Sequence, residues 1–259
     1  MPRTDRRSLL IRHLREDGHA SVSALAQDLG VTPSTVRRHL ADLADEGVLV
    51  RTYGGAALTG ETAPARPGPV TEAKRAIGAA AAALVQDGQT IAISSGSTTL
   101  ELARRLVDRN LTVITNALDV ASVLLDREGI ELIMLGGVVR PQMHSMLGHL
   151  AELALRELRA DTLFMGIGAI DPDHGLMNDS IPEVLTDRAL RRSARGCVVL
   201  ADSSKFVQVA PAFVFGLDEV DTVVTDDAVD PADVVTLQSH GVRVVVARPS
   251  TVGQEAARA

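Results

Sequence analysis

Residues 21–40 read SVSALAQDLGVTPSTVRRHL, and this stretch decides how the N-terminal part of the chain folds. Its first apolar residues have helical spacing and predict a short helix over residues 23–29, which Gly30 can end. Thr32 then suits the N-cap of a second helix, and Pro33 suits the first position of that helix. A short helix, a tight turn and a second helix form the pattern of a helix-turn-helix.

A wing is predicted directly after this second helix, which should extend to about residue 46 with Val36, Leu40 and Leu43 as its buried stripe. Residues 47–55 read GVLVRTYGG and have the composition of two short strands joined by a turn. A helix-turn-helix followed by such a hairpin is a winged helix, which is a small α+β domain.

The predicted winged helix suggests a DNA-binding surface. Residues 1–56 carry 8 arginines and 7 acidic residues, whereas the rest of the chain carries 18 basic and 26 acidic residues. Arg37 and Arg38 alone fit the solvated face of a helical bundle, but the order of cap, turn and wing favours entry of the second helix into the major groove. The residues expected to contact double-stranded operator DNA are Thr32, Ser34, Thr35, Arg37, Arg38, His39, Arg51 and Tyr53.

The remaining chain predicts a second, larger domain. Residues 58–69 read LTGETAPARPGP, a Pro- and Gly-rich composition typical of an extended linker. We therefore expect a DNA-binding domain over residues 1–57, a linker over 58–70, an α/β domain over 71–250 and a tail over 251–259.

Short apolar segments alternate with helical patterns in the α/β domain, which predicts a Rossmann-like, mostly parallel sheet. The predicted strands are 90–94, 111–115, 130–135, 162–167, 197–201, 222–225 and 242–247. The predicted helices are 71–86, 100–107, 118–127, 147–158, 182–193 and 231–239.

The composition argues against membrane, disulfide and metal chemistry. The 259 residues are 46% hydrophobic and 23% charged, as expected of a globular protein with room for two domains. No apolar run approaches the roughly 20 residues of a membrane span, and the N-terminus lacks the apolar stretch of a secretory signal. Cys197 is the single cysteine and the histidines are scattered. We expect a cytoplasmic protein without a metal ion or cofactor.

Polar and glycine residues follow four of the predicted strands. Residues 94–99 read SSGSTT, where glycine allows close approach of a ligand and the hydroxyls and helix N-terminal amides can hold a phosphate. This loop is neither a Walker A nor a GxGxxG motif. The other strand ends contribute Asn116, Gly137 with Arg140, and Lys205, which is one of the two lysines of the chain. Because the carboxyl ends of parallel strands share one edge, we expect one ligand site there.

The sequence resembles the DeoR family of transcriptional regulators over nearly its whole length. In the N-terminal part, the similarity rests on Leu25-Ala26, Gly30-Val31, Thr35-Val36-Arg37-Arg38, Leu40, Leu43, Gly47 and Arg51-x-Tyr53-Gly54-Gly55-Ala56. In the α/β domain it rests on Lys74-x-x-Ile77-Gly78, residues 95–99, Thr115-Asn116, Gly136-Gly137-x-x-Arg140, Gly148, Gly166-x-Gly168-x-x-Asp171, Gly175, Glu183 and residues 201–206.

This resemblance implies a repressor of a carbohydrate catabolic operon whose C-terminal domain is similar to sugar-phosphate isomerases and deaminases. The domain is then expected to bind a phosphorylated sugar or a related metabolite that releases the DNA. The implied effector site consists of Ser95, Gly96, Ser97, Thr98, Thr99, Asn116, Gly137, Arg140, Glu183 and Lys205. His39, Ser94 and Met177 depart from the family pattern, which usually has acidic, aspartate and threonine residues at or near these positions.

Two alternative functions compete with this interpretation. A sugar-phosphate isomerase or deaminase would need a base, for which Asp171, Asp173, His174 and Glu183 are available. However, no tight acidic cluster follows the fourth predicted strand, and residues 171–175 have the composition of a turn. A regulator that senses a non-phosphorylated ligand or a protein is the second alternative, which the loop at residues 94–99 disfavours. Because paired recognition helices read paired half-sites, we expect a homodimer or homotetramer.

Overall fold

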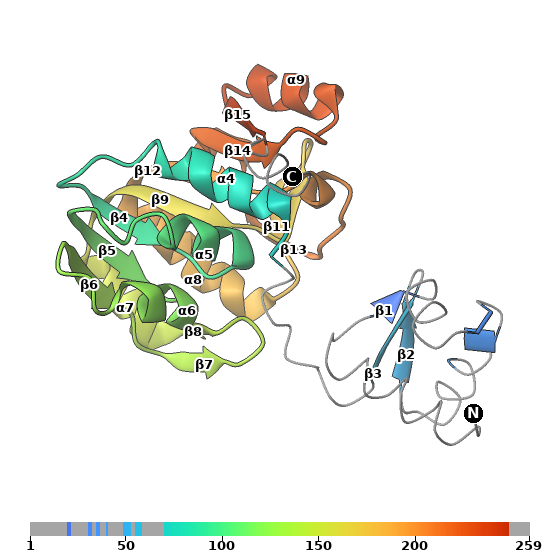
Figure 1. Ribbon diagram of the computed structural model, residues 1–259, viewed down its shortest axis with the longest axis horizontal. Helices are drawn as coiled ribbons and strands as arrows, with labels where there is room; N and C mark the ends of the chain where they lie inside the picture. Colours follow the sequence, from blue (N-terminus) through green and yellow to red (C-terminus); the bar gives the residue numbers. More distant parts are fainter. Residues whose placement is uncertain are drawn as a thin grey trace, which may run out of the picture. The chain divides into compact units, whose positions relative to one another are not determined.

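The computed structural model describes residues 20–21, 31–32, 35–36, 40, 49–52, 55–58 and 70–248. The chain divides into two compact units, Met1–Arg66 and Pro67–Ala259, and the division falls within the predicted linker. Figure 1 shows both units, each of which is described by itself.

The N-terminal unit contains the predicted wing. Strands β2 (Leu49–Thr52) and β3 (Gly55–Leu58) pair antiparallel, from Leu49 opposite Leu58 to Thr52 opposite Gly55. Strand β1 (Ala20–Ser21) joins the other edge of β3, which gives the order β1-β3-β2. A hairpin is confirmed here, but its second strand is Gly55–Leu58 and lies mostly beyond the predicted residues 47–55. The helix predicted over residues 23–29 lies outside the described residues.

The start of the predicted recognition helix is also confirmed. The backbone N–H of Thr35 donates to Oγ1 of Thr32 at 3.3 Å and to its carbonyl oxygen at 3.0 Å, as an N-cap requires. Residues 35–36 and 40 are helical, and Val36 and Leu40 are buried. The predicted apolar stripe is therefore present in the part of this helix that the structure describes.

The C-terminal unit is built on a seven-stranded sheet with the order β15-β14-β12-β9-β4-β5-β6, in which every neighbouring pair is parallel. The strands are β4 (Thr90–Ile93), β5 (Leu111–Thr115), β6 (Ile130–Met134), β9 (Ala160–Gly166), β12 (Ala194–Leu200), β14 (Thr222–Asp226) and β15 (Arg243–Ala247). The expected α/β fold with a mostly parallel sheet is confirmed.

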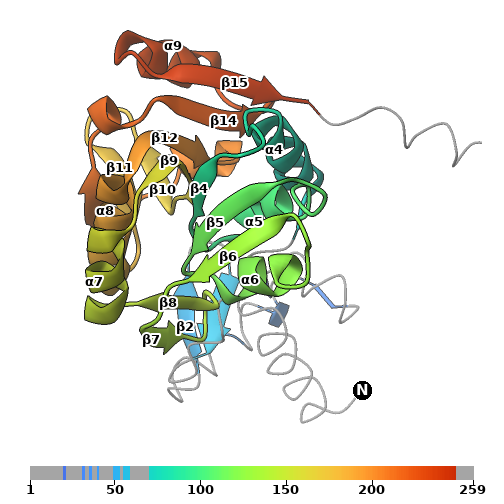
Figure 2. The ribbon, with the colours of Figure 1, turned by 90° about the vertical axis from the view of Figure 1, so that its left-hand side faces the viewer.

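Helices cover both faces of this sheet, as Figure 2 shows. The helices are α4 (Glu72–Ala82), α5 (Ser97–Ala103), α6 (Leu118–Leu124), α7 (His149–Glu157), α8 (Ile181–Ser193) and α9 (Pro231–Ser239). Two short 3-10 helices are η1 (Ser203–Phe206) and η2 (Leu217–Glu219). Because successive strand residues face opposite sides, Ile91 and Ile93 join the core under α4 and α5, whereas Ala92 joins the core under α7 and α8.

Five short antiparallel strands of the C-terminal unit were not predicted. Strands β7 (Val138–Arg140) and β8 (Ser145–Leu147) form a hairpin. Strands β10 (Ala169–Asp171), β11 (Gly175–Asn178) and β13 (Ala212–Phe215) form a three-stranded sheet. Gly137 follows the third parallel strand β6, which ends at Met134, as predicted. Arg140 does not belong to that strand end, because it lies on β7 of the hairpin.

Candidate effector site

The sheet changes direction between its central strands β4 and β9. From β4 the chain proceeds outward through β5 to β6, and it then returns to β9 and proceeds the other way through β12, β14 and β15. The connections that follow β4 and β9 therefore leave in opposite directions. In open parallel sheets, ligands generally bind outside the carboxyl ends of the strands at such a switch point.

The loop that follows β4 begins at this switch point of the sheet. Gly96 has a φ of 147°, which favours glycine, and its carbonyl oxygen accepts hydrogen bonds from Leu100 N at 3.0 Å and Thr99 Oγ1 at 2.9 Å. Thr98 and Thr99 are buried, whereas residues 95–97 are half-buried. The Thr99 hydroxyl thus holds the loop from within, and residues 95–97 form its accessible part.

Asn116 follows β5, beside this loop, and has an unusual hydrogen-bonding state. The residue is 4% exposed, and Nδ2 donates to the carbonyl oxygen of Met146 at 3.0 Å. Its Oδ1 atom is buried and has no hydrogen-bond partner among the described residues. A buried carbonyl oxygen without a donor costs stability, so this atom is well suited to accept a hydrogen bond from a ligand.

The structure brings two further predicted residues together. The guanidinium group of Arg140 on β7 forms a short ion pair with Oε2 of Glu183 on α8. The hydroxyl group of Ser145 on β8 lies 3.5 Å from the other carboxylate oxygen of Glu183. The hairpin β7–β8 also contacts the end of β5, because the backbone N–H of Met146 donates to the carbonyl oxygen of Asn116 at 2.7 Å.

Asp187 and Asn178 belong to this cluster and were missed from the sequence. Asn178 Nδ2 donates to Asp187 Oδ2 at 2.9 Å. Burial and the neighbouring carboxylate of Glu183 raise the pKa of Asp187 to about 7, against the opposing effects of the bond from Asn178 and the charge of Arg140. The spacing of four residues between Glu183 and Asp187 places them on the same helix face and is a signal that could have found Asp187.

The cluster lies next to the carboxyl ends of the central strands β4 and β9. The backbone N–H of Gly166, at the end of β9, donates to Oγ of the buried Ser94 at 3.1 Å. A Cβ atom on Gly168 would lie 2.9 Å from Asn178 Oδ1, so the chain after β9 passes directly beside Asn178. The carboxyl ends of β4, β5 and β9, the hairpin and α8 therefore surround one region.

The backbone conformation and close packing at position 137 require glycine. Its φ is 148°, and a Cβ atom there would lie 2.5 Å from the carbonyl oxygen of Leu147 on the paired strand. Only glycine allows this approach. Gly137 thus shapes the hairpin that carries Arg140.

Lys205 lies after β12 on η1. The buried Asp226 shapes this turn, since it accepts a hydrogen bond from Ser203 N at 2.6 Å. The ammonium group of Lys205 donates to Gln208 Oε1 at 3.1 Å.

The other lysine of the chain, Lys74 on α4, is nearby. Burial lowers the pKa of Lys74, the charge of Asp202 opposes this shift, and the charge of Lys205 adds to it. Both lysines of the chain therefore lie near the end of β12. The scarcity of lysine, which pointed to Lys205 in the sequence, is a signal that could also have found Lys74.

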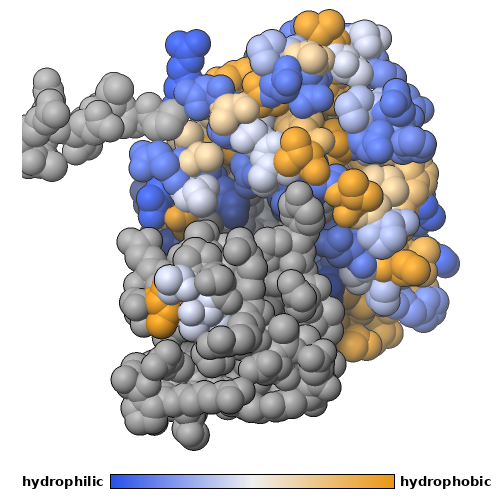
Figure 3. Space-filling model, turned by 90° about the vertical axis from the view of Figure 1, so that its right-hand side faces the viewer, coloured by the Kyte–Doolittle hydropathy of each residue, from blue (hydrophilic) through white to orange (hydrophobic). Residues whose placement is uncertain are grey.

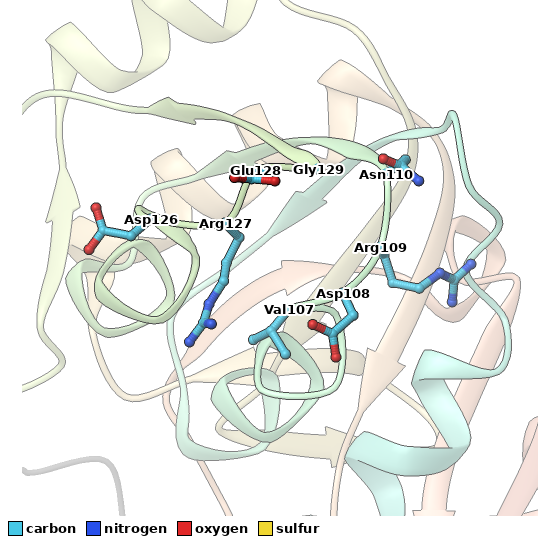
Figure 4. A pocket seen from close by; sticks show the side chains of 8 residues that line it. All are labelled: Val107, Asp108, Arg109, Asn110, Asp126, Arg127, Glu128 and Gly129. Atoms are coloured by element: carbon cyan, nitrogen blue, oxygen red, sulfur yellow. The ribbon is translucent and has the colours of Figure 1, made fainter.

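A separate open cavity of about 620 Å³ lies at the opposite edge of the sheet. Figure 4 shows the side chains of its two loops, residues 107–110 before β5 and residues 126–129 before β6. Its lining is largely charged, and it lies at the amino ends of these strands, away from the carboxyl-end cluster.

The predicted DNA-contacting residues are described in part. Thr32 and Thr35 lie at the helix start with their hydroxyl oxygens 2.9 Å apart. Arg51 lies on β2, where the structure describes its backbone. The predicted residues outside the described part of the chain are Ser34, Arg37, Arg38, His39 and Tyr53.

Membrane-spanning helices and metal clusters are absent from the described part of the chain. None of the helices described in residues 70–248 or at the recognition helix is long and apolar enough to cross a membrane. Within the same residues, no group of three or more His, Cys, Asp or Glu side chains could hold a metal ion.

Family models match both units of the chain. The model of a DeoR C-terminal sensor domain matches residues 70–227, and the model of a DeoR-like helix-turn-helix domain matches residues 6–62. The chain belongs to the DeoR family. As a DeoR family transcriptional regulator, it combines DNA binding through the helix-turn-helix with effector binding in the sensor domain.

Proteins named as transcriptional repressors are similar to this chain over most of their length. A protein of Escherichia coli O157:H7 named as a transcriptional repressor of the aga operon is 34% identical over 252 residues, which cover 94% of this chain and 93% of that protein. The glycerol-3-phosphate regulon repressor of Escherichia coli K12 is 31% identical over 250 residues, which cover 94% and 99%. These relatives are repressors rather than enzymes, so the isomerase or deaminase alternative is rejected for this DeoR family member.

Among solved structures, ribose 5-phosphate isomerase A from Methanocaldococcus jannaschii matches with a TM-score of 0.38 and 20% sequence identity. The match covers 51% of this chain and 53% of that chain.

Proposed function

We propose that this protein is a sequence-specific transcriptional repressor of a carbohydrate catabolic operon and that a phosphorylated sugar bound by the C-terminal domain releases it from DNA. The observation that carries the proposal is the loop at residues 94–99, which lies at the switch point of the sheet. The neighbouring strand β5 is followed by Asn116, whose Oδ1 atom is buried without a partner among the described residues. An operator in a bacterial cell lies in the cytoplasm, where the protein would act.

The phosphate end of the ligand would lie on residues 95–97. Their backbone amides at the start of α5 and the hydroxyls of Ser95 and Ser97 are suited to an anion. Lys205 and Lys74 would add positive charge from the neighbouring strand end. The name of one relative, the glycerol-3-phosphate regulon repressor, also supports a phosphorylated ligand.

The sugar end would lie toward Asn116, Arg140 and Glu183. Asn116 Oδ1 and the carboxylate of Glu183 can accept hydrogen bonds from hydroxyl groups, and Arg140 can donate them. Gly137 would contribute by holding the hairpin that carries Arg140. The buried residues 98–99 would support the loop from beneath.

The DNA half of the proposal rests on the recognition helix and the wing. On this surface, arginines would read base edges and hydroxyls would bind phosphates. Paired half-sites would require a homodimer or homotetramer. The proposed DNA contacts are those of Thr32, Ser34, Thr35, Arg37, Arg38, His39, Arg51 and Tyr53.

Exposed apolar side chains on α7 and α8 offer a surface for this self-association. Leu150 and Leu153 on α7, and Ile181 and Leu185 on α8, are each between 40% and 73% exposed. The two helices pack against each other. In the view of Figure 3, apolar residues lie between hydrophilic ones on the coloured part of the surface. Exposed apolar residues that gather on adjacent helices are typical of subunit interfaces.

Fluorescence anisotropy of the full-length protein on labelled DNA from upstream of its own gene tests the proposal. We expect salt-sensitive, sequence-selective binding that one member of a panel of phosphorylated sugars weakens by about 5–150-fold, the usual range of such couplings. Selective binding that no panel member changes would contradict the proposal that a phosphorylated sugar releases the protein from DNA. Absence of selective binding to this and other promoters would contradict the proposal that the protein is a sequence-specific repressor.

A further inference from the structure

Helix α8 presents two carboxylates, one turn apart, to the proposed effector site. Glu183 and Asp187 are each 8% exposed, so both side chains lie inside the domain. Their hydrogen-bond and ion-pair partners are Arg140 on β7, Ser145 on β8 and Asn178 on β11. The pair therefore lies where the hairpin β7–β8 and the strand β11 meet α8.

The groups that contact Glu183 and Asp187 do not neutralise the negative charge of the two carboxylates. Arg140 is the cation that contacts Glu183, and that carboxylate already engages it. The partners from β8 and β11 are Ser145 and Asn178, which are neutral. With both carboxylates ionised, these contacting groups together carry one negative charge more than positive charge, in a buried position where charge interactions are strong.

Two groups at this end are acceptors with unused capacity. The Oδ1 atom of Asn116 is buried without a donor among the described residues, and the carboxylate of Glu183 has lone pairs beyond those used by Arg140 and Ser145. A ligand that brings hydroxyl or amine donors satisfies these atoms. A ligand that brings a second anionic group meets like charges and offers Asn116 Oδ1 no donor.

We propose that the Glu183–Asp187 pair makes the sensor selective for phosphorylated ligands whose other end donates hydrogen bonds and is not anionic. Sugar phosphates and amino-sugar phosphates belong to this class, whereas the phosphorylated sugar acids do not. The inference rests on the proposed function, because it assumes that the phosphate binds at residues 95–97. Asp187 acts as a specificity-determining residue through its charge, and Asn178 positions it.

Matched pairs of compounds that differ at the end away from the phosphate test this selectivity. Calorimetric titration of the full-length protein at a pH of about 8, where Asp187 is mostly ionised, compares glycerol 3-phosphate with 3-phosphoglycerate, ribose 5-phosphate with 5-phosphoribonate, and glucose 6-phosphate with 6-phosphogluconate. Glucosamine 6-phosphate distinguishes an amine donor from a hydroxyl donor, and inorganic phosphate reports on the phosphate end alone. We expect the non-acidic member of any pair that binds to have at least a roughly tenfold lower Kd.

Charge-removing variants assign the effect to α8. Asp187→Asn and Glu183→Gln should each narrow the preference for the non-acidic member severalfold. Glu157→Gln, which removes an exposed carboxylate on α7, should leave the preference unchanged. The asparagine at position 187 can still accept the bond from Asn178, so this variant preserves the local contacts.

The outcomes separate the two proposals. Equal affinities within each pair in the wild-type protein, or an unchanged ratio in both folded variants, would overturn the selectivity while phosphate binding stands. If neither inorganic phosphate nor any phosphorylated compound binds, the proposed effector site fails and the selectivity fails with it. The ratio of the two Kd values within each pair, measured on the wild-type protein, tests the selectivity even if a variant does not fold.

Discussion

Asn178 donates a hydrogen bond from Nδ2 to Oδ2 of Asp187 over 2.9 Å, and this bond joins strand β11 to helix α8 inside the proposed site. The carboxylate that receives it is buried beside a second carboxylate, Glu183. This arrangement raises the pKa of Asp187 in the folded protein, so the free energy of unfolding should depend on pH.

The stability of the wild-type protein should depend on pH through Asp187. Its pKa is about 7 in the folded protein and 3.8 ordinarily, so the folded state keeps a proton that the unfolded chain has released between these values. Stability contributed by this proton is therefore lost as the pH rises from about 4 to about 7. Urea denaturation across this range should show a smaller loss for Asp187→Asn than for the wild type. Asp173→Asn, at an exposed turn, is the control, and equal pH profiles of Asp187→Asn and wild type would contradict the assignment.

Gly137→Ala should destabilise the hairpin that carries Arg140. The substitution places a Cβ atom 2.5 Å from the carbonyl oxygen of Leu147 at a φ of 148°. We expect a decrease of about 1–3 kcal/mol in the free energy of unfolding. Gly136→Ala is a matched control, because a Cβ atom there meets no described atom within 4 Å. Denaturation of both variants measures the difference in their free energies of unfolding. Equal values would show that the backbone of the hairpin can shift to accommodate a Cβ atom at position 137.

The two lysines should matter for ligand binding and not for DNA binding. Lys205→Ala and Lys74→Ala each remove one positive charge near the end of β12, so both should weaken the ligand response severalfold. Arg243→Ala removes an exposed charge at the first residue of β15 and serves as the control. Anisotropy with and without the ligand gives the response, and a full response of both lysine variants would exclude these residues from the site.

The recognition helix is tested by Arg37→Ala combined with Arg38→Ala. Removal of two guanidinium groups should weaken operator binding and reduce the slope of log affinity against log salt by roughly 1 for each phosphate that the variant no longer neutralises. Titrations at several salt concentrations measure both quantities, and an unchanged circular dichroism spectrum verifies folding. Normal affinity with an unchanged slope would show that the second helix of the helix-turn-helix is placed wrongly.

Local sequence signals determined the main elements of the sheet unit. Helix α9 begins at Pro231 and ends at Ser239 as predicted, because Asp230 caps it through a bond from Ala232 N at 2.8 Å and Pro231 fits its first position. Strand β5 also has its predicted bounds. The apolar runs and the polar residues that follow them were sufficient to predict the parallel sheet and the edge at which its polar residues gather.

Other elements had no comparable local signal. Strands β7, β8 and β10 contain three residues each, too few for a periodic pattern, and they form because a partner strand supplies their hydrogen bonds. Helix α5 begins at Ser97, three residues before its predicted start, because the conformation of Gly96 allows the helix to follow the loop directly.

By itself, the sequence determined the DeoR family membership, a hairpin in the N-terminal unit, and the alternating strands and helices, because each depends on residues close together in the chain. The tertiary structure alone decided that Arg140 pairs with Glu183, that Asn178 bonds Asp187, and that Lys74 lies near Lys205. These contacts join different elements of the fold, and burial gives Asp187 a protonation equilibrium that its residue type alone does not predict.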